Sequence, residues 1–496
     1  MKTAKVRINV IVSFGGQFIV LLLGIFLPRI MIVNYGSDTN GLISTVAQIF
    51  TYMALLEAGI GQAAKNALYK PIAEQKRDEV SHVTSIASQY YRRVTVYYAL
   101  GVLMLSIFVP FLVKSNVDKM TIFGIVILEG LSGVCSFYFI QTPSTILLAD
   151  GKGYINNLIV YGNKILAYAV KLIMAAFSIN IVLMYFVFFL ITVAKVFIYQ
   201  RYFWKHYPWI ELHRVTKGEK LRDRNSYVLT ELAWTVFSST DMIILSIFIG
   251  TELSSVYGVY NLVFSNLNVL LTAVYASVSY VLGITFFKSI SEYKKVHDAF
   301  MTVFMATVTI LMCVAYIMVL PFIRLYTRGV TDVEYFYQQL PLLFCLVQML
   351  SWSRYVSGNL TGIAGYAKQT SIISLIEATS NIVLSIFLVN NYGIQGVLFA
   401  TVISLPLKVV YCNYIADKKV LKRSIWQTVK ILGINYILYF AAVLVCPYIC
   451  WPISGYLDFC IYSVIILIIV SAVVILANFM INPQAYRIML MFRESR

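Results

Sequence analysis

Fourteen apolar runs occupy most of the chain, and each of them is long enough to cross a membrane as a helix. The hydrocarbon core of a bilayer is about 30 Å thick, so a crossing helix needs about 20 mostly apolar residues. The runs lie near residues 9–33, 41–64, 94–113, 120–148, 156–177, 181–200, 227–249, 254–286, 300–323, 335–362, 370–390, 394–415, 431–450 and 456–480. The sequence therefore predicts an all-α integral membrane protein with about fourteen transmembrane helices.

The composition supports lipid as the solvent. Apolar residues make up 60% of the chain and charged residues 12%, whereas about a quarter of the residues in soluble domains are charged. The net charge of +17 could indicate a nucleic-acid partner, but the basic residues form short clusters between the apolar runs and not one stripe. We therefore attribute them to membrane topology and expect no nucleic-acid partner.

The distribution of basic residues predicts the orientation of the chain. With the N-terminus inside, the outer loops hold only four of the 39 lysines and arginines, namely Lys114, Lys119, Arg324 and Arg328. An excess of Lys and Arg marks cytoplasmic loops, so both termini are expected in the cytosol. The outer loops are also short, which leaves no room outside for a catalytic domain.

An internal repeat divides the transmembrane runs into two sets of six. Residues Tyr69–Arg77 recur as Phe287–Lys295, and a similar offset relates Lys195 to Lys408. Because six is even, the two halves have the same orientation, and an axis along the membrane normal should relate them, with a site at their interface. The last two helices are an addition to this repeat.

The expected organisation has six segments. They are an N-terminal six-helix lobe (1–200), a basic cytosolic linker (201–226), a C-terminal six-helix lobe (227–415), a second basic linker (416–430), two additional helices (431–480) and a cytosolic tail (481–496).

Ionisable residues within the apolar runs are candidates for function. Each costs about 2.5 to 3.5 kcal/mol on insertion scales, so such residues tend to face a cavity or a partner. The eleven are Arg29, Glu57, Glu129, Lys164, Lys171, Lys195, Glu231, Asp241, Arg354, Glu377 and Lys408.

A polar stripe in the run 156–177 predicts a cation-lined cavity. Tyr161, Lys164, Tyr168 and Lys171 are spaced by three or four residues and so lie on one helical face. We expect this face to bind substrate, and buried structural pairing of the lysines is the alternative. Glu377 occupies the repeat position of Lys164, so the second half is expected to contribute the opposite charge.

Three further residues are candidate substrate contacts. Arg29 follows Pro28, which should kink its helix, and a strut with Asp241 is the alternative role. Arg354 could meet either a substrate or a carboxylate. Asn261 belongs to a polar stripe in the run 254–286, where interhelical hydrogen bonds are the alternative.

Two lysines near the expected cytosolic ends of their helices have a simpler explanation. Lys195 and Lys408 lie within about two turns of those ends, where long aliphatic stems reach the headgroups. We expect both side chains to extend to the membrane surface.

The sequence contains none of the motifs that indicate enzyme chemistry. No Walker loop, dinucleotide fingerprint, catalytic triad or helical HExxH occurs, and the cysteines show no ligand spacing. We expect no enzyme activity, no cofactor, no metal site and no disulfide. The energy for transport should come from an ion gradient or from the substrate's own gradient. Glu377, Asp241 and Glu231 are candidate ion-coupling carboxylates, and a role as counter-ions is the alternative.

The layout and two local motifs resemble a known family. They are Tyr35-Gly-Ser-Asp-Thr-Asn-Gly-Leu42 in an outer loop and Leu55-Leu-Glu-Ala-Gly-Ile-Gly-Gln-Ala-Ala-Lys65 at a helix exit. With them, the chain resembles the polysaccharide-repeat (Wzx-type) flippases of the multidrug/oligosaccharidyl-lipid/polysaccharide exporter superfamily. The likeness extends over nearly the full length.

This resemblance implies a transport function. The family moves undecaprenyl-diphosphate-linked oligosaccharide repeat units across the bacterial plasma membrane by alternating access, for O-antigen, capsule or lipopolysaccharide. The implied partners are that lipid-linked oligosaccharide, membrane lipids, a coupling proton or sodium ion, and a polysaccharide polymerase complex. In related lipid II flippases two extra helices form a groove for the lipid tail, and the runs 431–450 and 456–480 look like their counterparts.

Two other functions compete with this interpretation. A multidrug or cation antiporter of the same superfamily shares the lobes, but the lysine stripe argues against organic cations as substrates. A membrane glycosyltransferase, polymerase or ligase also handles lipid-linked sugars, but it would need a catalytic loop outside the membrane.

Overall fold

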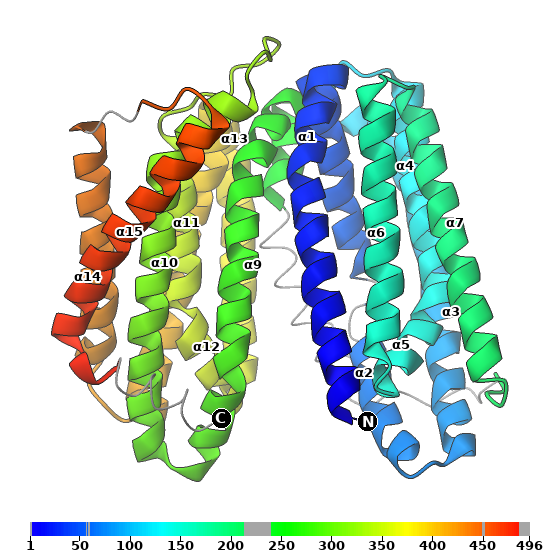
Figure 1. Cartoon of the computed structure of the whole chain (residues 1–496), viewed down its shortest axis with the longest axis horizontal. Helices are drawn as coiled ribbons and strands as arrows, with labels where there is room; N and C mark the ends of the chain where they lie inside the picture. Colours follow the sequence, from blue (N-terminus) through cyan, green and yellow to red (C-terminus); the bar gives the residue numbers. More distant parts are fainter. Residues whose placement is uncertain (1, 56, 58–59, 213–239, 449–451, 486–496) are drawn as a thin grey trace. The chain divides into compact units, whose positions relative to one another are not determined.

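The computed structural model describes residues 2–55, 57, 60–212, 240–448 and 452–485, and these residues are almost entirely helical with no strand (Figure 1). The expected coupling residue Glu231 and parts of the basic linker and of the C-terminal tail lie outside the described residues. By its internal contacts the chain divides into unit 1, Met1–Ser255, and unit 2, Val256–Arg496. The division thus falls later in the chain than the expected linker at 201–226.

The helices of unit 1 follow one another with short connections. They are α1 (Lys2–Ala54), α2 (Ile60–Ala73), α3 (Arg77–Leu112), α4 (Lys119–Cys135), a π-helical turn (Ser136–Ile140), α5 (Gln141–Ala149), α6 (Gly153–Ala176) and α7 (Ile181–His206). Unit 1 also contains the helical residues from 240 and the start of α9 (Thr251–Lys288).

Unit 2 continues with longer helices. They are the rest of α9, α10 (Ile290–Tyr326), α11 (Leu340–Ser353), α12 (Tyr355–Thr361), a π-helical turn (Gly362–Tyr366), α13 (Ala367–Tyr414), a second π-helical turn (Ile415–Val420), α14 (Trp426–Val445), a 3₁₀ turn (Cys446–Tyr448) and α15 (Tyr456–Ile481).

The structure confirms the predicted fold class. Ten helices of the described residues are long and apolar enough to cross a membrane. Two of these helices, α1 and α13, each cover two predicted runs. The two runs of α1 join at a kink at Gly36 (φ 85°), and those of α13 join at a kink at Gly393 (φ 52°). A positive φ is readily adopted by glycine, which has no Cβ. Both glycines therefore mark the points where one apolar run ends and the next begins.

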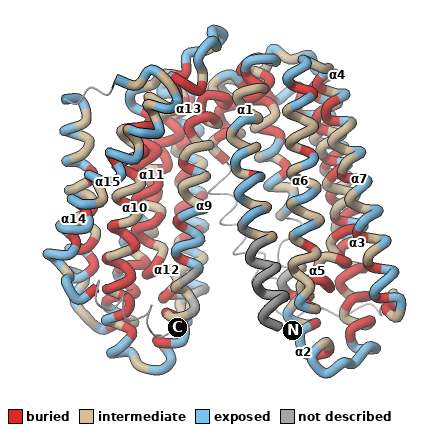
Figure 2. The backbone as a smooth tube through the Cα atoms, in the orientation of Figure 1, coloured by how far each residue is buried: buried red, intermediate tan, exposed pale blue. Residues whose placement is uncertain are grey.

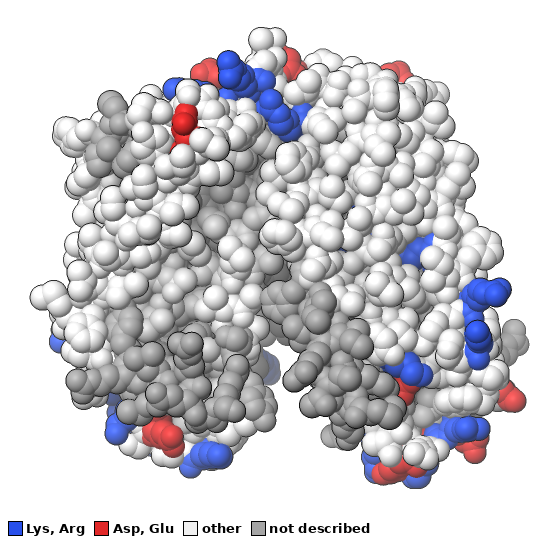
Figure 3. Space-filling view, in the orientation of Figure 1, with Lys and Arg blue, Asp and Glu red and all other residues white. Residues whose placement is uncertain are grey.

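Charged residues also lie where a membrane protein requires them. Figure 3 shows that Lys, Arg, Asp and Glu gather toward the two ends of the helices in each unit, and that the belt between is largely uncharged. The described helices also expose large apolar side chains such as Phe108, Phe111, Phe197 and Phe387. An exposed apolar band of this kind is stable in lipid and not in water.

In unit 1, α1 lies along α6 (Figure 1). A Cβ added at Gly16 of α1 would come within 2.7 Å of Cγ of Tyr161, so the missing side chain leaves room for that ring. Close to this contact, Nδ2 of Asn157 donates a hydrogen bond to Oγ of Ser13 at 2.9 Å. Small residues and interhelical hydrogen bonds are the usual means of packing helices in a membrane.

The residues from 240 to 255 are joined to α1 by polar contacts. Nδ2 of Asn40 donates to Oγ of Ser255 at 2.8 Å, and the hydroxyls of Thr45 and Ser246 form a 2.5 Å hydrogen bond. All four side chains are buried. These bonds explain why this segment belongs to unit 1.

We predict that Gly41→Ala destabilises unit 1 by about 1 to 3 kcal/mol, the usual cost of overpacking. A Cβ at this position would lie 1.7 Å from the carbonyl oxygen of Thr251. The matched control is Gly162→Ala, because a Cβ there has no heavy atom within 4 Å. Thermal unfolding in detergent measures both variants, and equal midpoints for the two would contradict the contact.

In unit 2, α10 carries much of the buried surface, whereas α14 and α15 are mostly exposed (Figure 2). Three buried polar side chains join these helices. Oγ1 of Thr309 donates to Oδ1 of Asn435 at 2.9 Å, and the amides of Asn435 and Asn478 bond to each other at 3.1 and 3.2 Å. The two additional helices are therefore fixed to α10 in a defined register.

Candidate functional site

A cavity of about 470 Å³ lies inside unit 1, with walls contributed mainly by α1, α4, α6 and α7. Its charged lining residues are three lysines, Lys164, Lys171 and Lys195, and one carboxylate, Glu129. An excess of positive charge in a partly desolvated space attracts anions more strongly than it would in water. The cavity is thus suited to an anionic group.

Helical spacing places the polar side chains of this cavity on the faces that line it. Lys164, Tyr168 and Lys171 of α6 follow one another at four and three residues, and all three line the cavity. On α7, the lining residues Tyr185, Phe188, Thr192 and Lys195 are spaced by three, four and three residues. The second stripe follows the same rule as the first and could have been recognised in the sequence.

Lys171 lies against two aromatic rings and near a carboxylate. Its Nζ lies 4.0 Å from the ring centre of Phe188 and 4.5 Å from that of Tyr185. The charge of Lys171 also interacts with that of Glu129. Cation–π contacts of desolvated lysines contribute about 2 kcal/mol, so Lys171 is already stabilised by the protein.

No ring contact like those of Lys171 is found for Lys164 or Lys195 among the described residues. Within the part of the chain that the structure describes, neither of them forms an ion pair. Their two charges act on each other as like charges. Lys164 is exposed and Lys195 is half-buried. These two ammonium groups are therefore available to an anion from outside the protein.

Unit 2 contains an ion-paired cluster within the membrane. Nη1 of Arg354 donates to Oε1 of Glu377, and Nζ of Lys408 lies 3.7 Å from Oε2 of the same carboxylate. Arg354 is 5% exposed and Glu377 is 2% exposed. The carboxylate offsets one of the two positive charges and so lowers the cost of burying them.

The prediction that Lys195 and Lys408 extend to the headgroups is wrong. Lys195 lines the cavity of unit 1, and Lys408 turns inward to Glu377. A buried carboxylate attracts the Lys408 ammonium group more strongly than the headgroup region does.

The other predicted site residues lie outside the unit 1 cavity lining. Tyr161 packs against Gly16 of α1, and Arg29 on α1 and Asn261 on α9 are half-buried. Asp241 lies near Tyr52, whose hydroxyl is bonded to Thr240. Glu129, which was one of the eleven ionisable candidates without a specific role, and Lys195, which was expected at the headgroups, both line the cavity.

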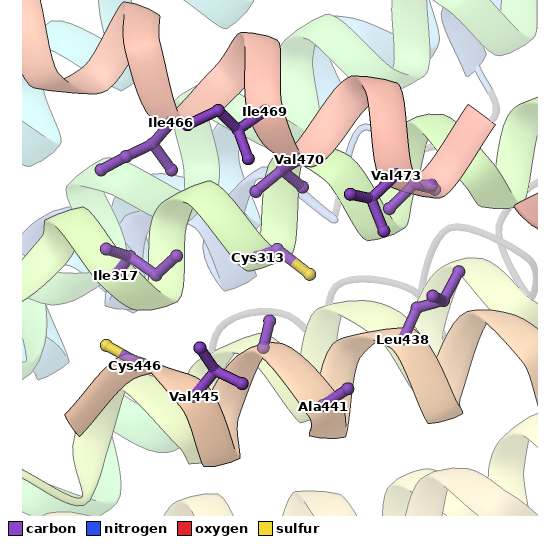
Figure 4. A pocket seen from close by; sticks show the side chains of 12 residues that line it. Cys313, Ile317, Leu438, Ala441, Val445, Cys446, Ile466, Ile469, Val470 and Val473 are labelled. Carbon is purple, nitrogen blue, oxygen red and sulfur yellow. The ribbon is translucent and has the colours of Figure 1, made fainter. Parts of the chain in front are cut away.

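A second cavity, of about 310 Å³, lies between α10, α14 and α15 of unit 2 (Figure 4). Its walls are aliphatic side chains and two cysteines, among them Ile317, Leu438, Val470 and Val473. Figure 4 shows that these side chains point from the three helices into the space between them. A cavity without polar groups is suited to a hydrocarbon chain.

Comparisons with known proteins identify the fold. No protein-family model matches the chain. No curated protein matches it either. A solved structure of the lipid II flippase MurJ in an inward closed conformation matches with a TM-score of 0.63 at 15% identity, over 95% of this chain and 99% of that one.

Two multidrug transporters match in the same way. An inward-facing MATE family transporter of the MOP superfamily has a TM-score of 0.62 at 11% identity, over 90% of this chain and 99% of that one. The MATE multidrug transporter DinF-BH, solved as a complex with a small molecule, has a TM-score of 0.59 at 16% identity, over 85% of this chain and 96% of that one. The chain is therefore a multi-pass membrane protein with the fold of the MOP-superfamily transporters.

Proposed function

We propose that the protein is a flippase, which moves an anionic lipid-linked oligosaccharide across the bacterial plasma membrane by alternating access, for export of a surface polysaccharide. The observation that carries this proposal is the charge of the unit 1 cavity, which is lined by three lysines and one glutamate. The diphosphate link of an undecaprenyl-diphosphate oligosaccharide supplies the anion that such a cavity attracts.

The apolar cavity beside α14 and α15 supports a lipid-linked substrate. Its aliphatic walls suit the prenyl chain, while the lysine-lined cavity of unit 1 suits the phosphates and sugars. A soluble anion would need only the second of these environments.

A multidrug or cation antiporter is the nearest alternative, since MATE transporters share the fold. An organic cation would be repelled by Lys164 and Lys195, which have no carboxylate partner among the described residues. We therefore favour an anionic substrate. The matching structures are transporters and not enzymes, which also weakens the glycosyltransferase, polymerase or ligase alternative.

Energy coupling belongs to the same proposal. Glu377 remains our first candidate for exchange of a proton or sodium ion and Asp241 our second, with Arg354, Arg29 and Asn261 as further substrate contacts. Exchange at Glu377 would require Arg354 and Lys408 to move away, because both cations now bind that carboxylate.

The test is flipping in proteoliposomes that contain the purified full chain. The probe is an undecaprenyl-diphosphate disaccharide with a fluorescent acidic sugar, which a membrane-impermeant quencher bleaches only in the outer leaflet. We expect the protein to accelerate loss of protected fluorescence. Transport of a cationic rhodamine dye, and not of the lipid probe, would favour the antiporter instead.

We predict that Ala441→Phe lowers the flipping rate about tenfold, because the ring fills part of the apolar cavity and displaces about two methylenes of the prenyl chain. Ala441 lines that cavity. The matched control is Leu444→Phe on the same helix, at an exposed position that is not part of the lining. An equal effect of both substitutions on flipping would argue against tail binding in the cavity.

A further inference from the structure

The internal repeat relates the ion cluster of unit 2 to residues of unit 1. An offset of 213 residues relates Gln141 to Arg354, Lys164 to Glu377, and Lys195 to Lys408. In unit 2 the first and third positions carry cations, Arg354 and Lys408. In unit 1 the third position also carries a cation, Lys195. Only the central position reverses its charge, from the carboxylate of Glu377 to the ammonium group of Lys164.

In unit 2 the central carboxylate acts as a built-in anion. Each of its oxygens is bound by a different cation, Oε1 by Arg354 and Oε2 by Lys408. Arg354 and Glu377 are buried and Lys408 is half-buried, and the carboxylate offsets one of the two positive charges. In this half the chain itself therefore supplies the anion that both cations bind.

In unit 1 the same three positions lack an anion. Lys164 stands where Glu377 would be, and its charge repels that of Lys195. Gln141 is uncharged and so supplies no anion either, and its Nε2 donates to Oε2 of Glu57 at 2.8 Å. Among the described residues, Glu129 is the only carboxylate that lines the cavity, and it interacts with Lys171.

We propose that Lys164 and Lys195 form an anion-binding site for a diphosphate, and that the equivalent site of unit 2 is filled by the side chain of Glu377. This inference rests on the proposed function and narrows it to two of the three lysines. Lys171 is a positioning residue of the cavity, because the rings of Tyr185 and Phe188 hold its ammonium group. A diphosphate suits the pair since it brings several oxygens and more than one negative charge to two separate ammonium groups.

The repeat itself suggests the decisive substitution. Lys164→Glu would place a carboxylate beside Lys195, as Glu377 lies beside Lys408, so the site would be filled from within and the charge of Lys195 would be neutralised. The variant should fold at least as well as the wild type, and yet lose affinity for external anions. Lys164→Gln and Lys195→Gln remove one charge each without supplying an anion.

The experiment measures binding to the detergent-purified full chain by calorimetry. The three probes are inorganic pyrophosphate, farnesyl diphosphate and farnesol, which separate the free anion, the lipid-linked anion and the prenyl chain alone. We expect both diphosphates to bind to the wild type. Affinity should fall about 10- to 100-fold in each glutamine variant, which loses one charge-assisted contact, and at least about 100-fold in Lys164→Glu.

Several results would overturn the site. One is that Lys164→Glu binds pyrophosphate as tightly as the wild type does. Another is that the wild type binds farnesol and farnesyl diphosphate with equal affinity. A third is that Lys171→Gln loses as much diphosphate affinity as Lys164→Gln does, at unchanged thermal stability. Failure of the proposed function looks different. The wild-type protein would then bind both diphosphates through these lysines but would not flip the undecaprenyl probe. That result would support the anion-binding site and refute the flippase function.

Discussion

Removal of all three cations from the unit 1 cavity is expected to abolish flipping. The variant Lys164→Gln/Lys171→Gln/Lys195→Gln leaves Glu129 as the only charged residue of the cavity lining, so the cavity changes from positive to negative. Hydrogen bonds to charged groups contribute about 1.5 to 3 kcal/mol each. Loss of two or more therefore lowers affinity for the diphosphate by at least about a hundredfold.

The measurement is flipping of the fluorescent undecaprenyl-diphosphate probe in proteoliposomes, together with surface polysaccharide in cells that depend on the variant. The control is Lys70→Gln/Lys288→Gln/Lys419→Gln, which has the same change in net charge at three exposed positions outside the cavity. Both proteins should be inserted in equal amounts. If the cavity variant flips the probe at the rate of this control, the cationic cavity is not the substrate site.

Loss of the Glu377 carboxylate is expected to destabilise unit 2 strongly. In Glu377→Ala, Arg354 and Lys408 lose the carboxylate that binds both of them, and Arg354 is almost fully buried. Removing one partner of a buried ion pair costs about 3 to 5 kcal/mol. Thermal unfolding should show a large decrease, whereas the exposed Glu334→Ala should leave the midpoint unchanged.

A triple variant separates stability from coupling. Replacing the whole cluster with apolar residues, as in Arg354→Met/Glu377→Leu/Lys408→Met, should restore much of the stability, because it leaves no uncompensated charge. If Glu377 also exchanges ions, this folded variant should flip the probe without responding to an imposed pH or sodium gradient. Wild-type dependence on the gradient in the triple variant would exclude Glu377 from coupling.

The sequence by itself determined the class of protein and the order of its helices. Hydropathy and helical period are local properties, so the apolar runs predicted most of the membrane-spanning helices, and the glycines at 36 and 393 mark where two runs join. The same local rule placed Lys164, Tyr168 and Lys171 on one face of α6, and all three line the cavity.

Only the tertiary structure decided which faces meet and which charges neutralise each other. Tyr161 shares the face of Lys164, yet it packs on Gly16, and Lys195 and Lys408 turn inward where the sequence favoured the headgroups. Glu377, predicted as an ion-coupling carboxylate, is bound to Arg354 and Lys408, which helical spacing did not show. The apolar cavity between α10, α14 and α15 likewise depends on three helices that are distant in the sequence. The partners of a long side chain depend on the neighbouring helix that packs against it, and helical spacing along one segment carries no information about that neighbour.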